Sequence, residues 1–346
     1  MKAAMFYGPN DVRLEEVDAP AIGPGGVLAR VDVGLTCGTD RKMLLRGHPL
    51  FRPPFVFGHE FAGTVVEVGH RVEHFKPGMR VVAANSAPCG QCFYCTRNAE
   101  SMCENLFLRL SGAFAEYIDI PEPIVEKNLL EIPDGLASRD AALLEPLACV
   151  VHGIERSGIR PGDTVVVNGA GPIGLMFVRL ASISAARVLV TDVRDDRLDR
   201  ARRLGADAVI NVSAVNDVAA AIREMCHDGR GADVAIEAVG LPATWESTIR
   251  MVRKGGIANL FGGCASGTTM TVDTSLIHYS EVQIRGVFHH TPRFVRRALD
   301  LLAQRAVTSE ELVTGELPLA RLDEILRSLV SHDGVKTAVI PAPGAA

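Results

Sequence analysis

The 346-residue sequence has no apolar run that approaches the roughly 20 residues needed to cross a bilayer. Aromatic residues make up only 5%, which leaves few side chains that can stack on nucleic-acid bases. Basic residues are outnumbered by acidic ones, and the net charge is -5. A protein that binds the phosphates of a nucleic acid is expected to carry an excess of basic residues. The N-terminal sequence MKAAMFYGPNDVRLEE turns polar too early for a signal peptide. We therefore expect a cytoplasmic protein with neither a membrane nor a nucleic-acid partner.

Cysteine is sparse as well, and its distribution is uneven. Eight cysteines in 346 residues are too few for a disulfide scaffold, yet four of them crowd into residues 89–103. Four thiolates fit a closed tetrahedral zinc site, with an iron–sulfur cluster or disulfides as the competing uses. We interpret the segment of about residues 85–105 as a lobe with structural zinc, held by Cys89, Cys92, Cys95 and Cys103.

The organisation of the chain changes twice. Up to residue 150, short β-branched runs lie between turn residues, as at 27–33 and 63–68, which predicts a β-rich domain. From residue 163, apolar strands alternate with helical segments, which predicts a parallel sheet covered by helices. Two amphipathic helices follow at 289–304 and 319–331, and TAVI at 337–340 is expected to pair back into the first domain. We predict an α/β protein in which residues 151–288 interrupt a domain of residues 1–150 and 289–346.

The segment GAGPIG lies between a predicted strand and a predicted helix, as in a dinucleotide-binding turn. Asp192 ends the next predicted strand, where an acid binds the adenosine ribose. Its carboxylate repels a 2′-phosphate and favours NAD over NADP. Arg194 or Arg197 could instead accommodate that phosphate, and Arg197 could equally lie over the adenine. The residues expected to bind the cofactor are Gly169, Gly171, Pro172, Ile173, Gly174, Asp192 and Arg197.

A second set of candidate metal ligands is dispersed along the sequence. It comprises Cys37 in CGTD, His59 and Glu60 in GHE, and Glu145 in LLEPLA. A cysteine, a histidine and a carboxylate leave one tetrahedral position open for water or substrate, as catalytic zinc requires.

Together these motifs carry a family resemblance. GHEFAGTVVEVG at 58–69, CGTD at 37–40, the four-cysteine lobe and GAGPIG resemble the zinc-dependent medium-chain dehydrogenases. LLEPLACVVHGIERSG at 143–158 is similar to the polyol branch, which includes sorbitol and threonine dehydrogenases. The resemblance implies a GroES-like catalytic domain with an inserted Rossmann domain, and an active site in the cleft between them.

The resemblance also implies roles for individual residues. Catalytic zinc is held by Cys37, His59 and a glutamate, with Glu145 favoured and Glu60 exchanging. Thr39 matches the hydroxyl that relays the alcohol proton, and Asp40 matches the acid that orients His59. We count Cys37, Thr39, His59, Glu60 and Glu145 as the catalytic set.

The sequence departs from its relatives where substrate is expected. Lys42 replaces a histidine that many relatives carry, and His289-His290 stands in place of the Arg-Tyr pair of sorbitol-type enzymes. His48 and Phe51 lie in a segment expected to line the pocket. These five residues are the candidate substrate contacts.

We predict an enzyme with two zinc ions per chain that uses NAD to oxidise a secondary alcohol on a small polyhydroxylated substrate. A sugar alcohol, a cyclitol or an aldonate would fit. The resemblance implies a homotetramer or a homodimer. One alternative is an L-threonine 3-dehydrogenase, and another is a non-catalytic cofactor-binding or structural protein that kept the fold.

Overall fold

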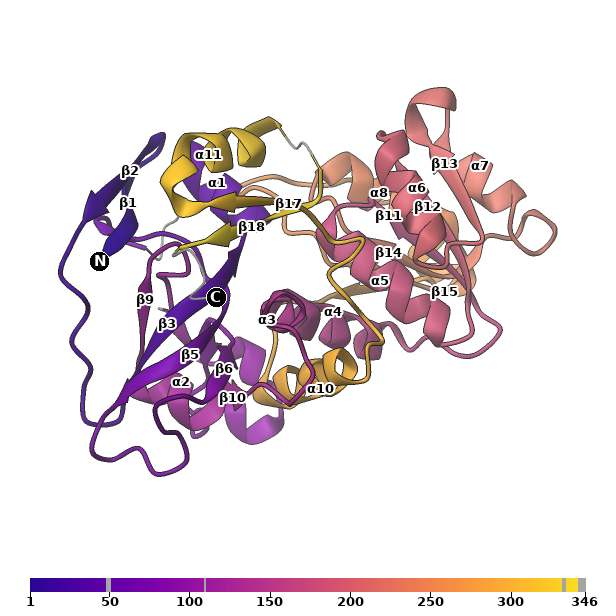
Figure 1. Ribbon diagram of the computed structural model, residues 1–346. Helices are drawn as coiled ribbons and strands as arrows, with labels where there is room; N and C mark the ends of the chain where they lie inside the picture. Colours follow the sequence, from indigo (N-terminus) through magenta and orange to yellow (C-terminus); the bar gives the residue numbers. More distant parts are fainter. Residues whose placement is uncertain (48–50, 109, 332–333, 342–346) are drawn as a thin grey trace. The chain divides into compact units, whose positions relative to one another are not determined.

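The computed structural model describes residues 1–47, 51–108, 110–331 and 334–341. The chain divides into two compact units. The first comprises Met1–Ala148 and His290–Ala346, and the second is Cys149–His289. The sequence analysis placed the seams at 150/151 and 288/289. The elements of both units are labelled in Figure 1.

The first unit is built on a mostly antiparallel core sheet with the strand order β10-β6-β5-β3-β18-β17, and β9 also pairs with β3. Smaller sheets of β2-β1-β4 and β7-β8 complete the β-rich fold that the sequence predicted. The strands are β1 (Lys2–Gly8), β2 (Asp11–Glu16), β3 (Val27–Leu35), β4 (Phe55–Val56), β5 (Glu60–Val68), β6 (Arg80–Ala83), β7 (Ser86–Ala87), β8 (Phe107–Leu108), β9 (Tyr117–Ile120), β10 (Leu129–Glu131), β17 (Val313–Pro318) and β18 (Lys336–Ile340).

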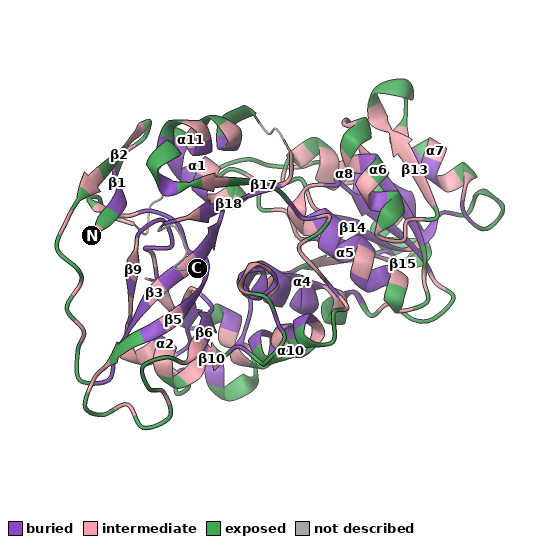
Figure 2. Cartoon of the chain, viewed as in Figure 1, coloured by how far each residue is buried: buried purple, intermediate pink, exposed green. Residues whose placement is uncertain are grey.

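The apolar side chains of β3 and β5 are mostly buried in the core of this unit, because β-branched residues pack well on a pleated, half-buried surface. Phe57 anchors the core, with its ring 5.6 Å from Phe6 and 5.8 Å from Phe114. Buried residues accordingly gather in strands such as β3 (Figure 2). The helices are α1 (Gly38–Arg46), α2 (Glu122–Lys127), α3 (Ser138–Ala141), α4 (Leu144–Ser157), α10 (Pro292–Ala303) and α11 (Leu322–Ser331), and the unit boundary falls within α4.

The end of the chain returns to the first unit. β18 pairs antiparallel with β3, with Ala338 opposite Leu35 and Val339 opposite Gly34. It also pairs in parallel with β17. This confirms the prediction that TAVI joins the first domain, and it places the start of β18 beside the end of β3.

The second unit is a six-stranded parallel sheet in the order β13-β12-β11-β14-β15-β16. This is the strand order of a Rossmann dinucleotide-binding fold, as predicted. All five residues of β11 are buried because parallel strands are covered on both faces. The strands are β11 (Thr164–Asn168), β12 (Arg187–Asp192), β13 (Ala208–Asn211), β14 (Ala232–Glu237), β15 (Val252–Leu260) and β16 (Gln283–Gly286), and the helices are α5 (Pro172–Ile183), α6 (Asp195–Arg203), α7 (Val218–Glu224), α8 (Pro242–Met251) and α9 (Thr274–His278).

Throughout the described part of the chain, every helix is too short or too polar to span a membrane.

Candidate active site and metal centres

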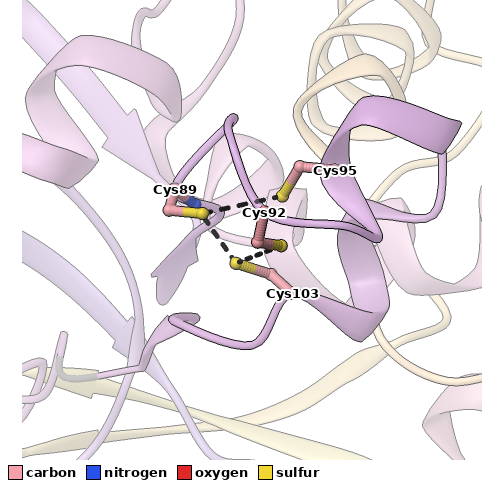
Figure 3. Close-up of side chains that lie close together, drawn as sticks. All are labelled: Cys89, Cys92, Cys95 and Cys103. Atoms are coloured by element: carbon pink, nitrogen blue, oxygen red, sulfur yellow. Dashed lines mark hydrogen bonds between the residues drawn. The ribbon is translucent and has the colours of Figure 1, made fainter.

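The four-cysteine lobe brings its sulfur atoms together. Cys89 Sγ lies 4.0 Å from Cys95 Sγ, and Cys92 Sγ lies 3.9 Å from Cys103 Sγ. All four sulfurs lie within 4.8 Å of one another and point toward a common centre (Figure 3). A tetrahedron with metal–sulfur bonds of about 2.3 Å has edges of about 3.8 Å, so the spacing fits one zinc ion. None of these cysteines is in a disulfide.

Backbone N–H groups of the lobe are arranged to stabilise thiolates. A hydrogen bond from the Gln91 backbone is the main cause that lowers the pKa of Cys89 to about 6. The Cys89 amide in turn donates to Cys103 Sγ at 3.2 Å. Such N–H···S contacts favour the deprotonated form that binds metal, whereas burial raises the pKa of Cys103 overall and that of Cys95 to about 12.

Cys37 is placed by the start of a helix. It is the N-cap of α1, where its sulfur accepts from the Thr39 amide at 3.5 Å. Its own amide donates to Asp40 Oδ2 at 2.8 Å, which completes a capping box. The sequence CGTD therefore fixes the thiol and the following Thr39 relative to one another. Burial, with the nearby Glu60 carboxylate, raises the pKa of Cys37.

His59 precedes β5, and its ring lies near the Asp40 carboxylate and the Cys37 sulfur. Nδ1 is 3.0 Å from Asp40 Oδ1, and the Asp40 side chain is fully buried. This contact fixes the ring orientation and leaves Nε2 for a metal, as expected for an acid behind a ligating histidine. Burial opposes a charged ring, but Asp40 and Cys37 outweigh it and raise the pKa of His59 well above its usual range.

Glu60, the first residue of β5, has no exposed surface. One of its carboxylate oxygens, a sulfur of Cys37 and a ring nitrogen of His59 all lie within 4.8 Å of one another. Oε2 accepts from Lys336 Nζ at 2.5 Å, whereas Oε1 is buried without a hydrogen-bond partner among the described residues. Burial lowers the pKa of Lys336, but the Glu60 carboxylate outweighs it and raises that pKa overall.

Glu145 lies in the first turn of α4 and is 7% exposed. Burial is the main cause that raises its pKa to about 7, and the charges of His59 and Glu60 also act on it. His290 is buried beside it, with Nε2 3.8 Å from Glu145 Oε1 and 3.2 Å from Asn85 Oδ1.

The donor atoms of this cluster fit a divalent cation. Cys37, His59 and Glu60 offer a sulfur, a ring nitrogen and a carboxylate oxygen that lie within 4.8 Å of one another, and Glu145 is a further buried carboxylate. Buried charges are costly unless they are compensated. The buried Oε1 of Glu60, which has no hydrogen-bond partner among the described residues, is an atom that a bound cation would satisfy.

The glycine-rich turn lies at the end of β11. Gly169 has a φ of +108°, and Gly171 is the N-cap of α5. A Cβ on Gly174 would lie 1.8 Å from the Gly169 carbonyl oxygen, so only glycine allows the helix to start there. Pro172 and Ile173 are the first positions of α5; proline has no amide hydrogen, so the free N–H groups at this end of the helix begin at Ile173. The local geometry is that of a pyrophosphate-binding turn.

Asp192 ends β12 and reaches back to this turn. Its Oδ2 accepts from the Ala170 amide at 2.7 Å, and its Oδ1 accepts from the Arg194 amide at 3.0 Å. The Arg194 guanidinium makes a two-point contact with Asp196 at 2.9 and 3.0 Å. Arg197 is half-buried in α6; burial lowers its pKa, and the Asp192 charge opposes this.

Three of the remaining substrate candidates lie among the described residues. Lys42 lies on the exposed side of α1. Phe51 packs against the core of the first unit, with its ring 5.5 Å from Phe55. His289 closes the second unit, where its carbonyl oxygen is 2.8 Å from His152 Nδ1. His48 lies outside the described residues.

Sequence analysis missed three residues that the structure places at these sites. Lys336 contacts Glu60, and Asn85 contacts His290. Glu237, at the end of β14, accepts from the Val239 and Gly240 amides at 3.0 and 2.9 Å and so holds the neighbouring turn. A lysine inside the otherwise apolar VKTAVI segment was the one available signal for Lys336.

A dinucleotide fold and a buried site for a divalent metal define a metal-dependent, nicotinamide-linked oxidoreductase. Family comparisons agree. The alcohol dehydrogenase GroES-like domain matches residues 23–134, and the zinc-binding dehydrogenase domain matches residues 172–304.

Individual relatives match the chain over nearly its whole length. Sorbitol dehydrogenase of Bacillus subtilis (strain 168) is 31% identical over 99% of this chain and 97% of its own. Erythritol/L-threitol dehydrogenase of Mycolicibacterium smegmatis is 34% identical over 99% and 98%. A crystal structure of a zinc-binding dehydrogenase from Sinorhizobium meliloti 1021 bound to NADP matches with a TM-score of 0.90 and 32% identity, covering 98% of this chain and 99% of that one. The protein therefore belongs to the zinc-dependent medium-chain dehydrogenase family, in its polyol dehydrogenase branch, as predicted.

Proposed function

We propose that the protein interconverts a secondary alcohol and a ketone on a small polyhydroxylated substrate, such as a sugar alcohol, a cyclitol or an aldonate. The observation that carries this proposal is the buried cluster of Cys37, His59 and Glu60, with Glu145 beside it. Its donors suit a zinc site that keeps a position open. The names of the relatives, sorbitol and erythritol/L-threitol dehydrogenase, supply the polyol class.

In this proposal, Cys37, His59 and either Glu145 or Glu60 hold the catalytic zinc. When bound, zinc would polarise the alcohol oxygen and the nicotinamide would accept the hydride. The Thr39 hydroxyl takes the alcohol proton and passes it toward solvent, so that the loss of a proton and a hydride yields the ketone. Asp40 keeps His59 in one tautomer and orientation through the 3.0 Å contact at Nδ1.

His290 is the substrate candidate that lies beside this cluster. Its ring is 3.8 Å from the Glu145 carboxylate, and a histidine can donate to or accept from a substrate hydroxyl. We assign to it the recognition of a neighbouring hydroxyl of the polyol. Lys42, His48, Phe51 and His289 stay predictions.

We propose NAD as the preferred cofactor. The Asp192 carboxylate at the end of β12 disfavours a 2′-phosphate, and the Arg194 guanidinium is engaged with Asp196. A second zinc ion would occupy the four-cysteine lobe and stabilise it, because a closed site has no position for substrate. A homotetramer or homodimer and a cytoplasmic location stay predictions.

The test is NADH formation at 340 nm across sugar alcohols, cyclitols, aldonates and L-threonine, with zinc content measured on the same preparation. Turnover on one polyol group that chelator abolishes is the expected result. Turnover on L-threonine alone would replace the proposal with a threonine 3-dehydrogenase. Cofactor binding with zinc-free protein and no turnover would support the non-catalytic hypothesis.

A further inference from the structure

β18 brings a charged side chain into the metal cluster. Lys336 is the first residue of β18, and its side chain is only 1% exposed. Its Nζ donates to Glu60 Oε2 at 2.5 Å and to the Thr36 carbonyl oxygen at 2.9 Å. Because Thr36 directly precedes Cys37, the ammonium contacts the carboxylate of one candidate ligand and the main chain next to another.

Backbone pairing fixes this position. The Thr36 amide donates to the Thr337 carbonyl oxygen at 3.0 Å, and the Thr337 amide donates to Thr36 Oγ1 at 2.8 Å. These bonds continue the antiparallel pairing of β18 with β3. The ammonium is therefore held by the sheet and does not depend on a flexible surface side chain.

Glu60 lies close both to the Lys336 ammonium and to the position proposed for the catalytic metal. One carboxylate oxygen faces Lys336, and the carboxylate also lies within reach of the point where Cys37 and His59 meet. A metal–carboxylate bond of about 2.0–2.2 Å would compete with the ammonium for the same group. We propose that Lys336 is a positioning residue that holds Glu60 and so keeps this carboxylate from closing the open coordination position of the catalytic metal. This inference rests on the proposed zinc-dependent function, with Glu145 as the third protein ligand.

Removal of the ammonium should therefore tighten metal binding. In Lys336→Met, Glu60 would remain buried with the metal as its one cationic partner, because a buried carboxylate needs compensation. The carboxylate would then ligate permanently and exclude the substrate. We expect zinc release from the cluster to slow by at least about tenfold, and kcat to fall by a similar factor. If Lys336 only supported the fold, its replacement by methionine would instead make zinc release faster.

The experiment compares zinc release to a chromogenic chelator, turnover and melting temperature in the full-length protein. The variants are Lys336→Met, Lys336→Arg, the double variant Lys336→Met with Glu60→Gln, and Thr337→Val. Arginine keeps the charge and should keep wild-type release. The double variant lacks the competing carboxylate, so it should not show the slower zinc release that is expected for Lys336→Met alone. Thr337→Val is the matched control, because it perturbs the same strand without removing the ammonium. Zinc release from the four-cysteine lobe serves as an internal reference, since it should be the same in all variants.

Absorption of the cobalt-substituted protein gives a readout that does not depend on turnover. Lys336→Met should change the cobalt bands because one ligand is added, and Thr337→Val should not. Lys336→Gln serves the same purpose if the methionine variant does not fold. Unchanged or faster metal release in folded Lys336→Met, or in Lys336→Gln where the methionine variant does not fold, with two zinc ions in the wild type, would overturn this inference alone. A wild-type protein with zinc in the lobe only would overturn the proposed function with it.

Discussion

Gly174→Ala tests whether the turn after β11 binds the cofactor through close packing. A Cβ at this position would lie 1.8 Å from the Gly169 carbonyl oxygen and 3.5 Å from Val167 Cγ1. A carbon–oxygen contact needs about 3.3 Å, so α5 must move by about 1.5 Å. Overpacking of this kind costs about 3 kcal/mol, which corresponds to a fall in melting temperature of about 4 °C when the 346-residue chain unfolds in one transition.

The displaced helix would also carry its free amides away from the pyrophosphate. We expect NADH binding, measured by calorimetric titration, to weaken at least about a hundredfold. Gly171→Ala is the matched control, since its φ is -69° and nothing lies within 4 Å of its Cβ. It should melt like the wild type yet bind NADH poorly, because the added methyl group blocks close approach of the backbone to the phosphates. Wild-type melting and binding in Gly174→Ala would refute the packing argument, and full binding in Gly171→Ala would refute the assignment of the phosphate site.

Three further predictions concern single side chains. Asp192→Asn keeps an acceptor for the glycine turn but loses the charge, so the preference for NAD over NADP should fall at least about tenfold in titrations; an unchanged ratio contradicts the ribose contact. Cys95→Ser should lose one zinc per chain by metal analysis and lower the melting temperature, and retention of two zinc ions would disprove the lobe site. Burial would raise the pKa of Asp233, but hydrogen bonds from the Thr164 amide and the Arg253 side chain lower it overall. Because this pKa is depressed in the folded state, its stabilisation is present above the unfolded value near 3.9 and is lost as the pH falls through the folded value. Asp233→Asn should therefore lower the free energy of unfolding by about 1–3 kcal/mol at pH 7 in urea titrations, with a smaller gap near pH 3, and a constant gap argues against this linkage.

The parts of the fold that the sequence predicted are those with a local signal. GAGPIG between an apolar strand and a helix, and the four closely spaced cysteines, carry their geometry within a few residues. The TAVI strand was also recognisable from its composition, although its partner β3 lies about 300 residues away in the sequence.

The parts that it did not predict depend on contacts between distant segments. Glu60 and Lys336 are 276 residues apart, and Asn85 and His290 are 205 apart. Most lysines are exposed to solvent, and composition does not show which one is buried. Burial of Lys336 depends on how the strands of the whole sheet pair. The unit boundary falls between His289 and His290, one residue from the predicted seam at 288/289.

The central claim is that a zinc ion held by Cys37 and His59 is required for turnover. The most direct measurement is zinc content, NADH affinity and polyol turnover in the wild type and in Cys37→Ser and His59→Ala. The account predicts about two zinc ions per chain in the wild type and about one in each variant. It also predicts NADH binding close to that of the wild type, with no turnover in either variant. Full activity in either variant would contradict the catalytic zinc assignment.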